Sequence, residues 1–214
     1  MSFLASTVLD KASLFLEDPD KARWSNNTLI SFLNDGLKRL IVIDTSANPQ
    51  YTAHPLDMGA KQSISNNALY LLDVLYNTDV TGVVQGKAPL RVKKATLDFT
   101  NPKWTQTTKQ DTVQFYMYEL EDNNTFYVYP PNTGDGFLYI KEAQFLTEVT
   151  APTDSIPLSF EYQLALSYYI CFSCFMMDTD TANDAKAERY RSLFLDQLSQ
   201  LKQSDAGEEQ KNAS

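Results

Sequence analysis

The sequence has very little histidine, with His54 as the single imidazole among 214 residues. Most triad and acid–base schemes need a positioned histidine, and a zinc site would need partner ligands that His54 lacks nearby. No GxSxG, HExxH, P-loop or dinucleotide glycine pattern occurs either. We therefore expect no catalytic, cofactor-binding or metal-binding residues, and we expect that the chain is not an enzyme.

Cysteine is also scarce, because Cys171 and Cys174 are the only two. Their CxxC spacing would suit a redox motif at a strand-to-helix turn, but Cys171 lies inside the apolar run from Leu164 to Phe172 and Cys174 lies two residues beyond its end. Zinc would require two further ligands. We predict that both thiols are buried and pack as small hydrophobes.

Long apolar runs and net positive charge are missing as well. No stretch approaches the roughly 18 to 20 apolar residues of a membrane span, and residues 1–6 lack the start of a signal peptide. We therefore expect a soluble intracellular product. The 27 acidic and 18 basic residues give a net charge of -9, which is the wrong sign for binding DNA through its phosphates.

Basic residues gather in one place, which reads as a strand with apolar residues between the charges. The pattern favours a solvated strand face, and a contact with phosphate or with a protein partner is the alternative. The basic residues are Lys87, Arg91, Lys93 and Lys94.

Four segments carry apolar residues at three- and four-residue steps, which predicts helices over residues 3–17, 26–43, 157–177 and 181–203. Gly36 costs about 1 kcal/mol relative to alanine inside a helix, so we expect it to mark a close helix crossing. The segment 204–214 has no apolar side chain larger than alanine, and we expect a flexible C-terminal tail.

Between the helical pairs, the segment from Thr45 to about Gln85 shows no dominant period, and we expect a mixed connection. Residues 87–146 change to a period of two, which predicts a β-rich insertion, and the segment 130–136 reads as a hairpin loop. Because both helical pairs must bury their apolar stripes, we expect one α+β domain over residues 1–203. It would be mainly a helical bundle with an inserted antiparallel β region.

One acidic group lies beside aromatic residues and could in principle cleave sugars. It comprises Glu119, Glu121 and Asp122, and ordinary solvated carboxylates at a strand turn are the favoured interpretation.

Several short sequence segments, taken in their order along the chain, resemble the adaptor or head-to-tail connector proteins of short-tailed bacteriophages. The similarity spans roughly residues 8 to 200. The segments lie at residues 16–25, 29–37, 56–62, 71–74, 101–104, 126–131, 156–157 and 165–169.

The resemblance implies a structural virion protein at the head–tail junction, assembled in the host cytoplasm as a ring of twelve copies. Its partners would be the portal protein and the tail nozzle protein, and DNA would pass through the channel without specific binding. By the same resemblance, the end of the last helix docks on the portal through Phe194, Leu198, Leu201 and Asp205.

The helix over 157–177 is apolar around much of its girth and therefore needs a second partner surface. We predict that it packs between subunits through Tyr162, Tyr169, Phe172 and Met176. Two alternatives remain open: a nozzle or tail-completion ring protein, and a carbohydrate-binding or carbohydrate-degrading virion protein, which the 12 tyrosines and 2 tryptophans suggest.

Overall fold

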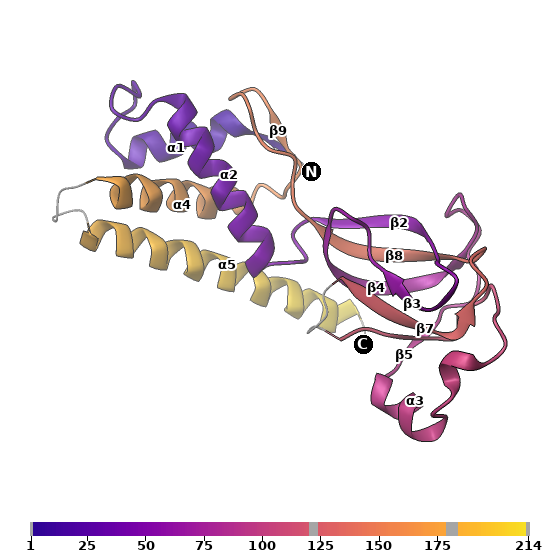
Figure 1. Ribbon diagram of the computed structural model, residues 1–214. Coiled ribbons are helices and arrows are strands. Elements are labelled where there is room, and N and C mark those ends of the chain that lie inside the picture. Colours follow the sequence, from indigo (N-terminus) through magenta and orange to yellow (C-terminus); the bar gives the residue numbers. More distant parts are fainter. Residues whose placement is uncertain (1, 120–123, 179–183, 213–214) are drawn as a thin grey trace. The chain divides into compact units, whose positions relative to one another are not determined.

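The computed structural model describes residues 2–119, 124–178 and 184–212, with side chains as far as Gln203. The chain divides into two compact units (Figure 1). The helical unit joins Met1–Asn48 to Leu146–Ser214, and the β unit is the continuous stretch Pro49–Phe145.

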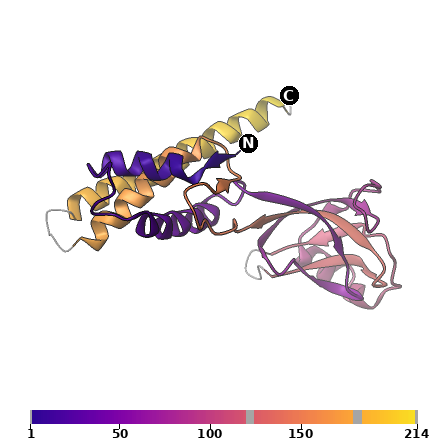
Figure 2. The same ribbon diagram turned by 90° about the horizontal axis from the view of Figure 1, so that it is seen from above.

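In the helical unit, α4 lies at the centre and contacts α1, α2 and α5. Figure 2 shows α5, in yellow, running alongside α4 and past its end. A two-stranded pairing of β1 with β9 joins the two sequence-distant parts of this unit. The elements are β1 (Phe3–Leu4), α1 (Ala5–Phe15), α2 (Asn26–Ile43), β9 (Ser155–Ile156), α4 (Tyr162–Met177) and α5 (Asp184–Asn212).

Side chains at the α1–α2 connection explain why the chain turns there. The Asp18 carboxylate accepts hydrogen bonds from the backbone N–H groups of Ala22, Arg23 and Trp24. The Ser25 hydroxyl then caps α2 by accepting from the Thr28 N–H at 3.3 Å, which satisfies one of the donors that a helix start leaves unpaired.

Gly36 marks the place where α2 crosses α4. A Cβ atom at this position would lie 2.9 Å from Cδ1 of Tyr169 and 3.5 Å from Cδ2 of Leu166. Real Cβ atoms do not approach this closely, so the glycine is what allows the two helices to pack. The expected close crossing at Gly36 is confirmed.

The β unit is built from two sheets. One has the order β2-β8-β4 and the other β3-β7-β6-β5. Their buried side chains form a shared core that includes Val74, Tyr116, Phe126, Val128 and Ile140. The strands are β2 (Pro49–Pro55), β3 (Gly59–Ser63), β4 (Ala68–Thr78), β5 (Leu90–Arg91), β6 (Phe115–Met117), β7 (Thr125–Asn132) and β8 (Phe137–Gln144).

A short helix, α3 (Lys94–Thr100), and the 3-10 turn η1 (Trp104–Gln106) follow β5. Trp104, the first residue of η1, is buried against Ala60 and Met117, and Tyr127 and Tyr129 complete this second core. The alternation along β7 thus places Phe126 and Val128 in one core and Tyr127 and Tyr129 in the other, which confirms the predicted period of two.

The prediction of a mainly helical bundle is wrong. The chain is mixed α/β, with 39% helix and 25% strand, and its described residues form five helices and about nine strands in three sheets. The difference arises largely between residues 49 and 78, where we expected a mixed connection and the structure has β2, β3 and β4. The β region therefore begins at Pro49 and not near residue 87.

The predicted hairpin is also wrong, because β7 and β8 are consecutive in the chain but belong to different sheets. The Asn132 side chain holds the link by accepting from the N–H groups of Gly134 and Gly136. The segment 94–100, within the predicted β-rich insertion, is the helix α3.

Several helix ends differ from the prediction. Residues 155–156 pair as β9, so α4 begins at Tyr162 and not at 157. The predicted start at residue 181 lies outside the described residues. At its other end α5 continues to Asn212, beyond the predicted end at 203. Flexibility of residues 204–214 in the free chain stays a prediction.

Candidate interaction surfaces of the helical unit

The residues predicted to dock on the portal lie on α5. Phe194 and Leu198 are only 2% and 1% exposed, and Leu201 is half-buried. The Phe194 ring packs edge-on against Tyr169 of α4, with 5.2 Å between ring centroids. The Asp205 side chain lies outside the described residues. Phe194 and Leu198 therefore fasten α5 to its own unit, and direct docking would have to use other side chains of this helix.

The four residues predicted to pack between subunits lie at different depths along α4. Tyr162 is buried, and its hydroxyl donates to Oδ2 of Asp44 at 2.8 Å. Met176 is 60% exposed near the opposite end of the helix. The structure therefore brings neither of these two residues to a surface shared with the others.

Tyr169 and Phe172 do lie together, with 5.7 Å between their ring centroids. Both line a groove of about 310 Å³ between α2, α4 and α5. Desolvation raises the pKa of the Tyr169 hydroxyl, which keeps this ring neutral. The remaining lining residues are Arg39, Arg191, Phe194 and Leu195. The groove thus combines an aromatic floor with two guanidinium groups at its rim.

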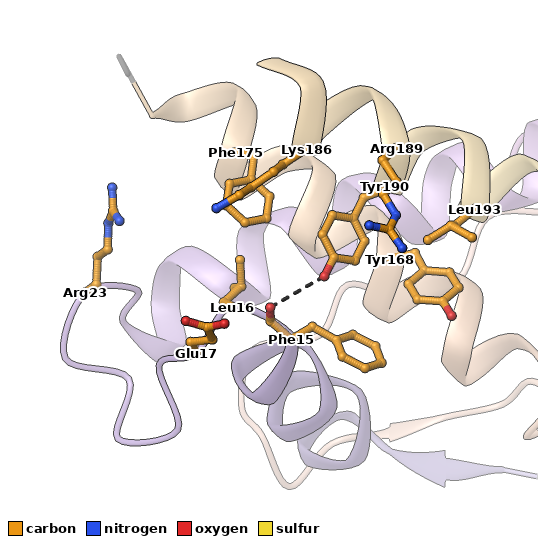
Figure 3. Close-up of a pocket in the computed structure, with 10 residues that line it drawn as sticks. All are labelled: Phe15, Leu16, Glu17, Arg23, Tyr168, Phe175, Lys186, Arg189, Tyr190 and Leu193. Carbon is orange, nitrogen blue, oxygen red and sulfur yellow. Dashed lines mark hydrogen bonds between the residues drawn. The ribbon is translucent and has the colours of Figure 1, made fainter. Parts of the chain in front are cut away.

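A larger groove of about 490 Å³ lies where α1, α4 and α5 meet (Figure 3). Its aromatic wall is continuous: Phe15 stacks on Tyr168 at 5.6 Å, and Phe175 stacks on Tyr190 at 5.7 Å. The Tyr190 hydroxyl donates to the backbone oxygen of Phe15 at 3.5 Å, the dashed line in Figure 3. This bond ties the start of α5 to the end of α1.

The charges around this larger groove are mostly positive. Of its described lining residues, Arg23, Lys186 and Arg189 are basic and Glu17 is acidic. Arg23 forms an ion pair with Asp178, and the Lys186 ammonium lies 5.4 Å from the centre of the Phe175 ring. Aromatic faces beside cations suit an anionic or aromatic segment of a protein partner. None of the described residues that line the groove is a histidine, serine or cysteine that could act as a nucleophile or base.

The apolar spacing that predicted a helix over residues 3–17 did not indicate this groove. The available signal was on α5, where Lys186, Arg189 and Tyr190 recur at three- and four-residue steps and therefore share one helix face.

Both cysteines are free and fully buried in α4, as predicted. Burial raises the pKa of the Cys171 thiol well above its ordinary range and that of the Cys174 thiol to about 12. The thiolate is the form that attacks disulfides and binds metals. Desolvation therefore suppresses the reactivity of this CxxC pair.

Across the described ranges, no group of three or more His, Cys, Asp or Glu side chains could hold a metal ion. Of the acidic group considered for sugar cleavage, Glu121 and Asp122 lie outside the residues that the structure describes. None of the helices in the described parts of the chain combines the length and the apolar character needed to cross a bilayer.

Comparison with known proteins gives one clear result. No curated protein matches the chain. The family model described as "SU10 adaptor protein" matches residues 4–213, which is nearly the whole sequence and includes both units. The chain therefore belongs to the SU10 adaptor protein family, a family of phage head–tail adaptors.

Proposed function

We propose that the protein is a non-enzymatic adaptor that forms a ring on the portal and continues the DNA channel toward the tail nozzle. Family membership over residues 4–213 carries this proposal. As a member, the chain is a structural phage protein of the head–tail junction that interacts with head and tail components. The portal, the nozzle, twelve copies and assembly in the host cytoplasm are the finer parts that we propose.

The absence of enzymatic activity is also part of the proposal. A single histidine and two buried thiols of raised pKa support it, because acid–base and nucleophilic schemes would need exposed groups of this kind. The net charge of -9 supports a DNA conduit, since a channel wall of like charge does not retain the passing duplex.

We propose α5 as the portal-docking element. With 29 residues at about 1.5 Å per residue, it is roughly 44 Å long, whereas α4 has 16 residues. Phe194 and Leu198 hold its middle in the helical core, and the Lys202 ammonium donates to the Ile43 carbonyl at the end of α2. The part of α5 beyond Lys202 is then the part that is available to a groove on the portal.

This division of α5 defines a truncation test. Deleting residues 204–214 keeps Phe194, Leu198 and Lys202, so the helical unit should retain its thermal stability. We expect the truncated chain to lose incorporation into portal rings, as measured by co-sedimentation and electron microscopy of the mixture. Occupancy equal to that of the full chain would move the docking element elsewhere, and failure of the full chain to join the portal would contradict the proposed function itself.

A further inference from the structure

The β unit carries a basic surface that the proposed docking through α5 does not use. Residues 87–109, here called the basic lobe, hold six basic side chains and one acidic side chain, in a chain whose net charge is -9. The rest of the molecule is therefore more acidic than the total. Most of these cations are exposed; they are Lys87, Arg91, Lys93, Lys94, Lys103 and Lys109.

The lobe also displays a large apolar side chain in a fixed place. Phe99 on α3 is 89% exposed, whereas Trp104 a few residues later is buried. The indole N–H of Trp104 donates to Oδ1 of Asp98 at 2.8 Å, and the Lys94 ammonium donates to Oδ2 of the same carboxylate at 2.9 Å. Asp98, the one acidic residue of the lobe, is thus hydrogen-bonded within the lobe. The neighbouring Phe99 exposes its aromatic ring.

A surface of the opposite character lies on the same unit. The loop between β2 and β3 carries Asp57 and Met58, and Met58 is 68% exposed. The link between β7 and β8 packs beside it, because a Cβ at Gly134 would lie 3.6 Å from Met58 Cβ. Asp135 is exposed on this link, and the Thr133 hydroxyl there donates to Asp111. We call these residues the acidic tip.

Hydrogen bonds also fix the backbone of the acidic tip. The Gln62 side chain accepts from the Asp57 N–H at 2.6 Å and donates to the carbonyl oxygens of Asp57 and Gly59. The Leu56 N–H donates to the Gly136 carbonyl at 3.0 Å. The segments 56–60, 110–114 and 132–136 contain three aspartates and no lysine or arginine, and Lys61 and Lys109 adjoin them in the sequence.

We infer that the basic lobe of one copy docks on the acidic tip of a second copy, with Phe99 packed against Met58. Opposite charges surround an exposed apolar side chain on both surfaces, and a ring–thioether contact is favourable. The two surfaces differ, so the contact is head-to-tail, and head-to-tail contacts generate rings when the rotation closes. The inference rests on the proposed ring and assigns the surface that joins its neighbouring copies.

Duplex DNA is the other polyanion that a basic surface could bind. The structure favours the protein, because Phe99 and the exposed Leu90 lie among the cations, and contacts with phosphates do not bury such side chains. The chain itself also supplies a matching acidic and apolar surface.

Zero-length carbodiimide cross-linking tests the contact directly, because it joins only an ammonium and a carboxylate that touch. Full-length chains labelled with ¹⁴N and ¹⁵N are mixed at low salt and at the highest soluble concentration. We expect mixed-isotope peptides that link Lys93 or Lys103 to Asp57, Asp111 or Asp135. Mixed-isotope links that avoid the lobe, or the absence of any, would overturn the inference.

Matched variants then measure the contribution of each part by sedimentation. Lys103→Glu should weaken self-association about tenfold, whereas Lys186→Glu, the same change at an exposed site of the helical unit, should weaken it little. Phe99→Ser should act like Lys103→Glu, and Val83→Ser, at a side chain that is 82% exposed, should not. Equal losses from lobe and control variants would show a general charge or solubility effect and contradict the inference.

Two further readouts separate this inference from its alternatives. If Lys103→Glu abolishes binding to a labelled DNA duplex and leaves self-association unchanged, the lobe binds DNA and the inference is wrong. If lobe variants join portal rings with wild-type occupancy and spacing, the inference fails while the proposed function stands.

Discussion

The two units of the chain are assembled in opposite ways. The helical unit combines residues from both ends of the sequence, so β1 must meet β9 and α1 must meet α4 before its core exists. The β unit is one uninterrupted stretch, Pro49–Phe145, with a core of its own. A stretch with its own core can close without the remainder of the chain, whereas the helical unit must bring together segments more than a hundred residues apart.

The units also differ in what fills their interiors. In the helical unit, small residues allow close approach: Gly36 at the α2–α4 crossing, and Ala12 and Cys171 where α1 meets α4. The β unit is filled by large rings and branched side chains, with Phe126 and Trp104 each at the centre of a core. In the β unit, removing volume should therefore be most harmful at Phe126 and Trp104, and in the helical unit, adding volume should be most harmful at the Gly36 crossing.

The largest effect is expected for Phe126→Ala. This side chain is fully buried between the two sheets, and its removal should destabilise the β unit by about 3–5 kcal/mol. The natural tryptophans allow the units to be followed separately, because Trp24 belongs to the helical unit and Trp104 to the β unit. In a Trp24→Phe background, urea unfolding followed by fluorescence reports on Trp104 alone, and circular dichroism follows the helices.

Phe99→Ala is the matched control for this experiment, since it makes the same change in the same unit at an exposed side chain. It should leave the unfolding midpoint of Trp104 almost unchanged. If Phe126→Ala shifts the helical signal by as much as the Trp104 signal, the two units unfold together and the contrast between them does not hold for stability.

A smaller effect, in the opposite unit and from the opposite kind of change, is expected for Gly36→Val. The added Cβ would meet the Tyr169 ring at 2.9 Å, and such overpacking costs about 1–3 kcal/mol. Thermal unfolding followed by circular dichroism measures the loss. Ser31→Val, at an exposed position of α2, is the control for the lower helix propensity of valine. Combining Gly36→Val with Tyr169→Ala should be less harmful than the sum of the two, and additive losses would contradict the crossing as the cause.

The helical unit was the more predictable of the two. A period of 3.6 survives whatever the helix packs against, so Leu29, Leu33, Leu37 and Leu40 identified the buried face of α2 from spacing alone. The β region was misjudged because β4 shifts its register against β8 at three places, between Ala68 and Tyr70, Leu71 and Asp73, and Val74 and Tyr76. Each shift interrupts the alternation that identifies a strand, so residues 68–78 showed no clear period.

The sequence also did not predict which strands pair with one another. A strand followed by a turn and a second strand predicts a hairpin, but β7 pairs with β3 and β6 while β8 pairs with β2 and β4. The same limit affected the candidate surfaces. The resemblance implied that Phe194 and Leu198 dock on the portal, and apolar spacing cannot distinguish α4 of the same chain from a groove on another protein.

The smallest expected effect on stability concerns the loop between α1 and α2. It tests whether the helical unit and the β unit respond separately to acidic pH. The Trp24 N–H, and then the N–H groups of Ala22 and Arg23, hold the pKa of the Asp18 carboxyl below its ordinary value of 3.8. The folded state thus binds this proton more weakly than the unfolded state. The stabilisation is present above pH 3.8 and is lost as the pH falls through the folded-state pKa.

Asp18→Asn should lower the stability of the helical unit slightly at neutral pH and flatten its decline below pH 4, whereas Asp20→Asn in the same loop should do neither. Because the three N–H groups that bind this carboxylate belong to its own unit, the Trp104 signal should be the same in both variants at every pH. A change in the Trp104 midpoint with Asp18→Asn would mean that the acid stability of the two units is coupled.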